Sequence, residues 1–277
     1  MYSLRLRDRL YSLEPPRIMG IINVTPDSFS DGGEALTPEL ALRKAEALLR
    51  AGADILDIGA VSTRPGAPEV SLAEELHRLV PALRLIRKTF PEVPISVDTY
   101  RGEVARISIE EGAEMINDIS GGAFDPSLWP VVAHYGVPYV LMHIRGTPQT
   151  MQHNPEYSNV GREVWAYFVE KIQRLHHIGV YQIIIDPGFG FGKKVGHNYD
   201  LFRALHRFTR LGYPLLIGIS RKSMLWRVLE KTPREVIWAA TALHWEALRR
   251  GVQILRVHDV EPVRQLVQLL SQWKPSA

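Results

Sequence analysis

The sequence has eight short apolar runs with longer segments of helical periodicity between them, and few folds accept such an order. The apolar runs are rich in Ile and Val, which favour strands, and occupy residues 18–24, 55–58, 95–97, 115–116, 139–142, 183–185, 215–219 and 254–257. Apolar residues recur at the helical period over residues 39–50, 72–90, 103–111, 163–178, 199–211, 234–250 and 262–273. Glycine follows five of these segments, where a left-handed C-terminal cap is needed, at positions 52, 112, 179, 212 and 251. This order predicts parallel βα units.

Eight such units within the 277 residues match the size and count of a (β/α)8 barrel, the TIM barrel. We therefore predict an α/β chain with a single barrel domain over residues 1–277, in which residues 1–16 form an N-terminal extension. A doubly wound open sheet is the alternative, but it favours fewer strands and a glycine-rich turn after the first strand. In a barrel the active site lies at the C-terminal ends of the strands.

The composition excludes several classes of protein. Hydrophobic residues make up 45% and charged residues 23%, which is typical of globular domains. No apolar run reaches the roughly 18 residues of a membrane span, and no apolar stretch follows the charged N-terminus, so we expect neither a transmembrane helix nor a signal peptide. The chain has no cysteine, so we expect a cytoplasmic protein without disulfides or Cys-ligated metals. The net charge is +3 but the cations are scattered, which favours an anionic small molecule over nucleic acid.

Every predicted strand ends in a polar side chain, as expected of a functional barrel mouth. Read one or two residues past each strand, these are Asn23, Asp57, Asp98, Asn117 with Asp118, His143, Asp186, Ser220 and His258. A carboxylate there accepts two parallel N–H bonds, as from the edge of an aminopyrimidinone or from an arginine. The alternative is that Asp98, followed by Thr99, caps the next helix. For Asp186 capping is disfavoured because proline and a glycine-rich loop follow.

Cationic residues follow other strands and predict an anion site. Arg64 lies in Ser-Thr-Arg-Pro-Gly at 62–66, where it either binds phosphate or carboxylate oxygens or is a solvated turn residue. Ser220-Arg-Lys222-Ser closes the seventh strand, at the usual phosphate position of such barrels. Strand alternation puts Arg256 and His258 on the same side of the eighth strand. We therefore expect an anion site at one end of the mouth and a heterocycle site at the other.

The segment Asp-Pro-Gly-Phe-Gly-Phe-Gly-Lys at 186–193 fits neither a P-loop nor a dinucleotide fingerprint, because its spacing is Gly-x-Gly-x-Gly. It predicts a turn that displays Phe189 and Phe191, either of which could stack on a flat ring or pack beneath the loop. The ten histidines show no HExxH or comparable metal spacing, and no Ser-His-Asp arrangement or close carboxylate pair supports hydrolysis.

Taken together, the strand-end motifs resemble those of the dihydropteroate synthase family over about residues 17–259. The motifs are Gly-Ile-Ile-Asn-Val-Thr-Pro-Asp-Ser-Phe-Ser-Asp-Gly-Gly (20–33), Ser-Thr-Arg-Pro-Gly (62–66), Ser-Val-Asp-Thr (96–99), Asn-Asp-Ile-Ser-Gly-Gly (117–122), Leu-Met-His (141–143), Gly-Thr-Pro-Gln-Thr-Met-Gln (146–152), the 186–193 segment, Ser-Arg-Lys-Ser (220–223) and Arg-Val-His-Asp (256–259).

This resemblance implies a role for each matching residue. The pterin ring would be held by Asp98, Asn117, Asp186 and Lys222, with its faces against Met142 and Phe191. Asn23 would bind a Mg²⁺ ion on the diphosphate, and the diphosphate itself would contact Thr63, Arg64, Arg256 and His258. The 4-aminobenzoate carboxylate would lie near the turn from Ser220 to Lys222. Of these, the residues implied in catalysis are Arg64, Arg256, His258 and Lys222.

The resemblance further implies that (7,8-dihydropterin-6-yl)methyl diphosphate condenses with 4-aminobenzoate, that the enzyme is a homodimer, and that it is a sulfonamide target. One departure concerns the residues before Ser62, where the family commonly has Gly-Gly-Glu and this chain has Gly-Ala60-Val61. The alternatives are a pterin-binding methyltransferase and a non-catalytic pterin-binding barrel. Neither needs Arg64 and Arg256 together, and both arginines are present.

Overall fold

Eight parallel strands form the barrel that the sequence predicts. The computed structural model describes residues 2–25, 37–64 and 66–273. Its strands are β3 (Arg17–Asn23), β4 (Ile55–Gly59), β5 (Ile95–Asp98), β6 (Met115–Asp118), β7 (Tyr139–Met142), β8 (Ile183–Asp186), β9 (Leu216–Ile217) and β10 (Ile254–Val257). They pair in the order β8-β7-β6-β5-β4-β3-β10-β9. A parallel bridge between Ile185 and Leu215 closes the ring between β8 and β9, so the TIM-barrel prediction is confirmed.

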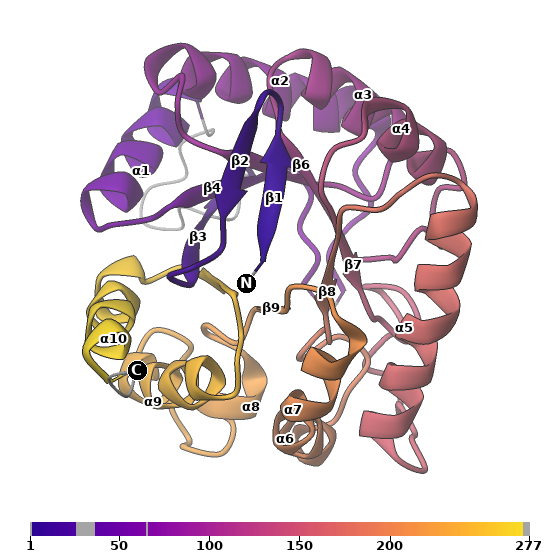
Figure 1. Cartoon of the computed structure of the whole chain (residues 1–277), viewed down its shortest axis with the longest axis vertical. Helices are drawn as coiled ribbons and strands as arrows, with labels where there is room; N and C mark the ends of the chain where they lie inside the picture. The colour runs from indigo at the N-terminus through magenta and orange to yellow at the C-terminus, as the bar shows by residue number, and fades with distance from the viewer. Residues whose placement is uncertain (1, 26–36, 65, 274–277) are drawn as a thin grey trace.

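The helices surround this ring of strands (Figure 1). They are α1 (Pro38–Arg50), α2 (Leu72–Thr89), α3 (Gly102–Glu110), α4 (Leu128–Tyr135), α5 (Val160–His177), α6 (Val195–Arg203), α7 (Leu205–Phe208), the 3-10 turn η2 (Thr209–Leu211), α8 (Ser223–Trp226), α9 (Ile237–Arg249) and α10 (Val260–Trp273). The five glycines expected at helix ends adopt φ between +81° and +108°, the left-handed region, as predicted. Helix α4 was not predicted, because its sequence LWPVVAHY is apolar on most sides and lacks an amphipathic period.

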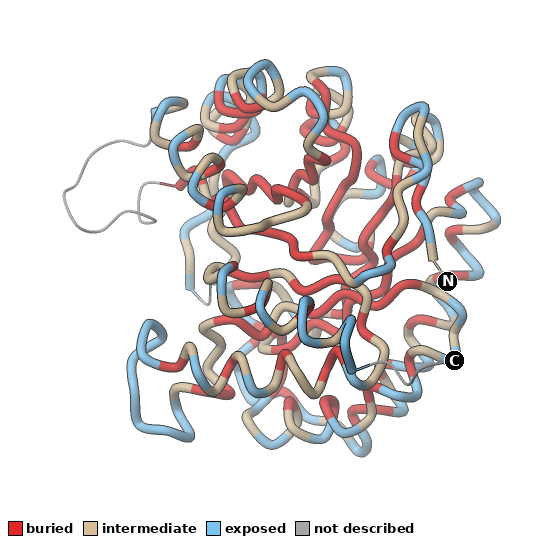
Figure 2. The backbone as a smooth tube through the Cα atoms, turned by 60° about the vertical axis from the view of Figure 1, so that its left-hand side comes forward, coloured by how far each residue is buried: buried red, intermediate tan, exposed pale blue. Residues whose placement is uncertain are grey.

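Burial separates the two layers of the barrel. The strands at the centre are almost entirely buried, whereas the helices bury only their inner faces (Figure 2). A continuous core of aliphatic and aromatic residues lies between the sheet and the helices. None of the helices that the structure describes is long and apolar enough to cross a bilayer.

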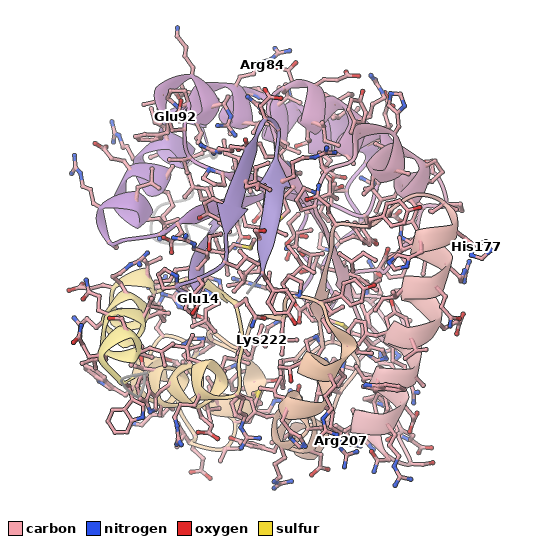
Figure 3. The ribbon with its side chains drawn as sticks, viewed as in Figure 1. Glu14, Arg84, Glu92, His177, Arg207 and Lys222 are labelled. Carbon is pink, nitrogen blue, oxygen red and sulfur yellow. The ribbon has the colours of Figure 1, made fainter. Side chains whose placement is uncertain are left out.

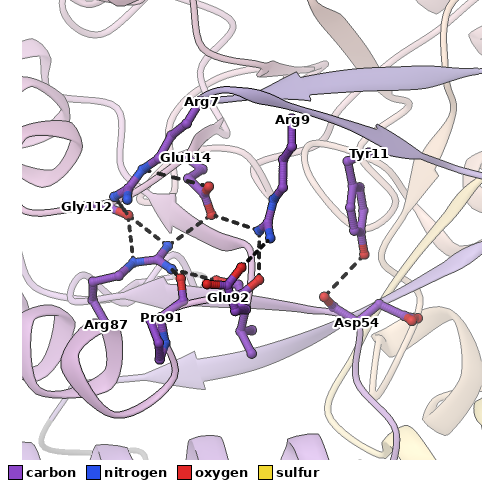
Figure 4. A network of polar contacts seen from close by, with 10 residues as sticks. Arg7, Arg9, Tyr11, Asp54, Arg87, Pro91, Glu92, Gly112 and Glu114 are labelled. Carbon is purple, nitrogen blue, oxygen red and sulfur yellow. Dashed lines mark hydrogen bonds and ion pairs between the residues drawn. The ribbon is translucent and has the colours of Figure 1, made fainter.

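A hairpin of β1 (Ser3–Leu6) and β2 (Arg9–Ser12), to which the sequence analysis assigned no strands, lies across the N-terminal end of the barrel (Figure 1). Leu4 and Leu6 of the hairpin pack on strand residues that line the barrel interior, namely Met19, Ile55, Met115, Val140, Ile184, Leu216 and Ile254. At its edge, Arg7, Arg9 and Arg87 surround the buried Glu114 (Figure 4). The hairpin therefore closes the end of the barrel opposite the predicted site.

Candidate active site

Four polar side chains from neighbouring strands meet at the C-terminal mouth of the barrel. Strand register places Asn117 directly beside Asp98 on the adjacent strand. Asp57 of β4 is fully buried, and its Oδ2 accepts a hydrogen bond from Asn117 Nδ2 at 3.1 Å. Asp186 ends β8, and its Oδ1 accepts the backbone N–H of Gly188 at 2.8 Å. The mouth thus has a floor of three carboxylates and one amide.

Arg256 of β10 lies against this carboxylate floor. Its Nε donates to Asp57 Oδ2 at 2.6 Å, and a terminal nitrogen donates to Asp98 Oδ2 at 2.7 Å. Arg256 is predicted from sequence to contact the diphosphate, whereas Asp57 has no predicted role beyond its position at a strand end. The structure joins the two in one ion-paired network, which anchors the Arg256 side chain to β4 and β5.

Burial shifts the pKa values of the charged groups in this site. It raises the pKa of Asp98 to about 7, although the nearby Arg256 guanidinium acts in the opposite direction. Burial also raises the pKa of Asp186 to about 6, against the hydrogen bond from Gly188. The pKa of Lys222 is lowered to about 8 by burial and by the charge of Arg256. Such shifts concentrate in functional sites, where charged groups are held in place for a ligand.

Apolar side chains lie beside the carboxylates. Met142 and Phe191 belong to one buried cluster with Ile119 and Met151, and the Lys222 ammonium lies 4.1 Å from the centre of the Phe191 ring. Phe189 instead packs in the main core against Phe202. Of the two phenylalanines that the sequence left open, Phe191 is therefore the one at the mouth.

The residues expected at the anion end come from four strand ends. Asn23 ends β3 and is half-buried, as is Thr63, whereas Arg64 is exposed to solvent. Ser220 Oγ lies 3.3 Å from both the backbone nitrogen and the ring Nδ1 of His258. Burial and the neighbouring cations Arg221 and Arg256 lower the pKa of His258 to about 3, so its ring is neutral at pH 7. Residues 26–33, which belong to the first motif (20–33), fall outside the described residues.

A loop after β8 brings Asp186, Phe191 and Lys222 together. The Lys222 stem passes 3.2 Å from where a Cβ would stand on Gly190. Because Gly190 has φ +82°, a side chain there would be strained and would press on Lys222. In Figure 3 Lys222 lies near the centre of the molecule, whereas His177 and Arg207 lie on outer helices. The sequence analysis overlooked Lys193 in the same loop, whose Nζ is buried among backbone carbonyls. Its only sequence signal is its place at the end of the glycine-rich segment.

Known protein families match this chain over the whole of the site. The model of the pterin binding enzyme family matches residues 19–258, which spans all the strand ends described above. A dihydropteroate synthase of Synechocystis is 46% identical over 255 residues, covering 91% of this chain and 88% of that protein. The chain belongs to the dihydropteroate synthase family.

Solved dihydropteroate synthases have the same architecture. A Yersinia pestis dihydropteroate synthase in a sulfonamide drug complex superposes with a TM-score of 0.94 at 39% identity, covering 99% of this chain and 100% of that one. The Xanthomonas albilineans dihydropteroate synthase in complex with 7,8-dihydropteroate gives a TM-score of 0.89 at 36% identity, with both chains fully covered. The resemblance inferred from the motifs is thereby confirmed at the level of the family.

Proposed function

We propose that this chain is a dihydropteroate synthase that transfers the pterinylmethyl group of (7,8-dihydropterin-6-yl)methyl diphosphate to the amino group of 4-aminobenzoate. The observation that carries the proposal is a small apolar cluster containing Met142 and Phe191 at the barrel mouth, where burial raises the pKa values of the Asp98 and Asp186 carboxyls. The 7,8-dihydropteroate bound by the Xanthomonas relative supports it.

The carboxylates at the mouth of the barrel can recognise the pterin ring through hydrogen bonds. A pterin edge offers an amino group and ring N–H groups, which match the free acceptor positions of Asp98 and Asp186. Lys222 offers a cationic donor next to the Phe191 ring. Because these groups are buried, a ring that lacked the matching donors would leave a carboxylate desolvated and unpaired, at a cost of about 1–3 kcal/mol or more.

The chemistry needs no protein nucleophile. The methylene C–O bond breaks with its electron pair on the diphosphate, and the resulting cation is delocalised into the dihydropterin. The arylamine lone pair then forms the C–N bond, and its proton leaves to water. Thr63, Arg64 and His258 would stabilise the departing diphosphate, with Arg256 held nearby by the carboxylates. Catalysis in this scheme depends on positioning and electrostatics.

The proposal includes Mg²⁺ on the diphosphate. The donor set fits the ion, because Mg²⁺ takes oxygen ligands and commonly binds through one or two protein groups, substrate phosphates and water. Asn23 supplies one amide oxygen at the mouth, and among the described residues no cluster of three His, Cys, Asp or Glu forms a self-sufficient metal site. The ion would supply charge neutralisation of the leaving group.

We also propose a cytoplasmic location, as the lack of cysteine led us to expect. A further proposal is that the protein is a homodimer. Trp238 of α9 and Trp273 of α10 are 78% and 69% exposed, on two helices that pack together. Exposed aromatic residues of this size mark protein interfaces. Light scattering should report twice the chain mass, and Trp238→Glu should shift the protein toward monomer.

A steady-state assay with the pterin diphosphate and 4-aminobenzoate tests the proposal directly. Release of diphosphate that depends on both substrates supports it. Methyl transfer from methyltetrahydrofolate would indicate the methyltransferase alternative, and pterin binding without turnover would indicate a non-catalytic barrel. Calorimetry adds a second test, because 4-aminobenzoate should bind about 5–150-fold more tightly once Mg²⁺ and diphosphate are present. Equal affinity in both conditions would show a preformed pocket.

A further inference from the structure

Lys193 has a buried amino group with several polar atoms around it, and this burial lowers the pKa of the group well below its ordinary value. Its side chain is 2% exposed, and its Nζ lies 2.8 Å from the carbonyl oxygen of Gly188 and 3.0 Å from that of Phe191. The same atom lies 2.9 Å from His143 Nδ1 and 3.4 Å from the His143 carbonyl oxygen. The Lys193 Nζ donates to the carbonyl oxygens of Gly188 and Phe191, and the direction of its contact with His143 Nδ1 follows from the tautomer of the ring.

These contacts join two loops at the mouth of the barrel. His143 directly follows Met142 at the end of β7, whereas Gly188 and Phe191 belong to the loop after β8. The two loops approach closely, since a Cβ on Gly188 would stand 1.9 Å from the His143 carbonyl oxygen. Lys193 thus bonds to Phe191 itself and to the immediate neighbour of Met142.

We propose that Lys193 is a positioning residue that fixes the separation of Met142 and Phe191, and so the width of the slot for the pterin ring. This rests on the proposed function. Lys193 also holds the carbonyl of Gly188, whose N–H donates to Asp186. The Lys193 side chain therefore positions both Phe191, which would lie against the pterin ring, and Asp186, which would bond to the edge of the ring. It does so without contacting the ring itself.

The first test compares Lys193→Met with Lys194→Met, an exposed lysine next to it that takes no part in these contacts. In Lys193→Met the carbonyls of Gly188 and Phe191 lose a buried donor, so the loop relaxes. We expect the dissociation constant of 6-hydroxymethyl-7,8-dihydropterin to rise about ten- to hundredfold. The constant for inorganic diphosphate with Mg²⁺ should stay within about twofold, because the diphosphate site lies at other strand ends.

Lys194→Met should match the unaltered protein for both ligands. Unchanged pterin affinity in Lys193→Met, or an equal loss for pterin and diphosphate, would overturn the proposal. Failure of the unaltered protein to bind pterin at all would instead refute the proposed function, so the two failures are distinguishable.

A second test does not depend on the folding of Lys193→Met. Because the chain has no cysteine, Lys193→Cys carries a single thiol that can be alkylated in denaturant with 2-bromoethylamine or 3-bromopropylamine before refolding. The first adduct has the length of lysine, and the second keeps the amino group but is one methylene longer. We expect the ethyl adduct to bind pterin within about threefold of the unaltered protein and the propyl adduct about tenfold more weakly. Equal affinity of the two adducts would overturn the proposal.

Discussion

Replacing Asp186 by Asn should raise the free energy of unfolding of the protein and lower its affinity for the pterin. Asn has the shape of a protonated Asp, and its side-chain oxygen can still accept the N–H of Gly188. The substitution therefore removes the buried charge and little else. It also replaces one of the acceptors proposed for the pterin edge by a donor.

The magnitude follows from the pKa of Asp186, which burial raises from 3.8 to about 6. Between these two pH values the folded protein holds a proton that the unfolded chain has lost, so the free energy of unfolding falls as the pH rises. Above pH 6 the ionised carboxylate therefore destabilises the folded state by about 3 kcal/mol, at about 1.4 kcal/mol for each unit of pKa. With about 2.1 cal/mol/K of unfolding entropy for each of the 277 residues, Asp186→Asn should raise Tm by about 5 °C at pH 8.

Thermal unfolding at pH 8 and pH 5 measures this effect, with titration of a pterin alcohol alongside. The gain in Tm should shrink toward pH 5, where Asp186 is itself protonated in the folded protein, and pterin affinity at pH 8 should fall at least about tenfold. Asp200→Asn, at an exposed position of α6, is the control for loss of a surface charge. A Tm at pH 8 no higher than that of the unaltered protein, or a gain independent of pH, would refute the reasoning.

Further predictions concern the other charged groups. Asp98 has a pKa of about 7 and Lys222 a pKa of about 8, which together predict a bell-shaped pH profile of kcat/KM. Binding should be lost below about pH 7, because Asp98 becomes protonated, and above about pH 8, because Lys222 loses its charge. Arg256→Ala removes a charge that lowers the pKa of Asp98, so the acidic flank of this pH profile should move to higher pH. An unmoved acidic flank would show that Arg256 does not set the pKa of Asp98. His258→Ala should weaken diphosphate far more than a pterin alcohol in calorimetry, and equal losses would mean a structural role. Glu114→Gln removes the buried carboxylate shared by Arg7, Arg9 and Arg87, while these arginines keep their bonds to backbone carbonyls and to Glu92. We therefore expect a loss of about 1–3 kcal/mol in denaturant unfolding, with pterin affinity unchanged.

The barrel could be predicted because its signals are local. Each βα unit carries its own apolar run and its own terminal glycine, and both patterns depend on neighbours a few residues away. The strand ends follow from the same pattern, so the sequence also predicted that Asp98, Asn117 and Asp186 would face one mouth. Helix α4 was missed because it lacks an amphipathic period. The β1–β2 hairpin was missed because its strands are only four residues long, although Leu4 and Leu6 alternate with polar residues. The hairpin is stable as an apolar cover packed on the barrel interior.

The partners of the site residues were decided only by the tertiary structure. Arg256 and Asp57 are 199 positions apart, and no local pattern relates them. Phe189 and Phe191 have the same neighbours in sequence, but the loop turns one into the core and the other toward Lys222. Lys193 has the same side chain as Lys194 beside it, yet it is buried because polar atoms from two loops converge on it. Sequence determines which side chains reach the mouth of the barrel, whereas the closure of the ring, which brings distant strands within hydrogen-bonding distance, determines which of them pair.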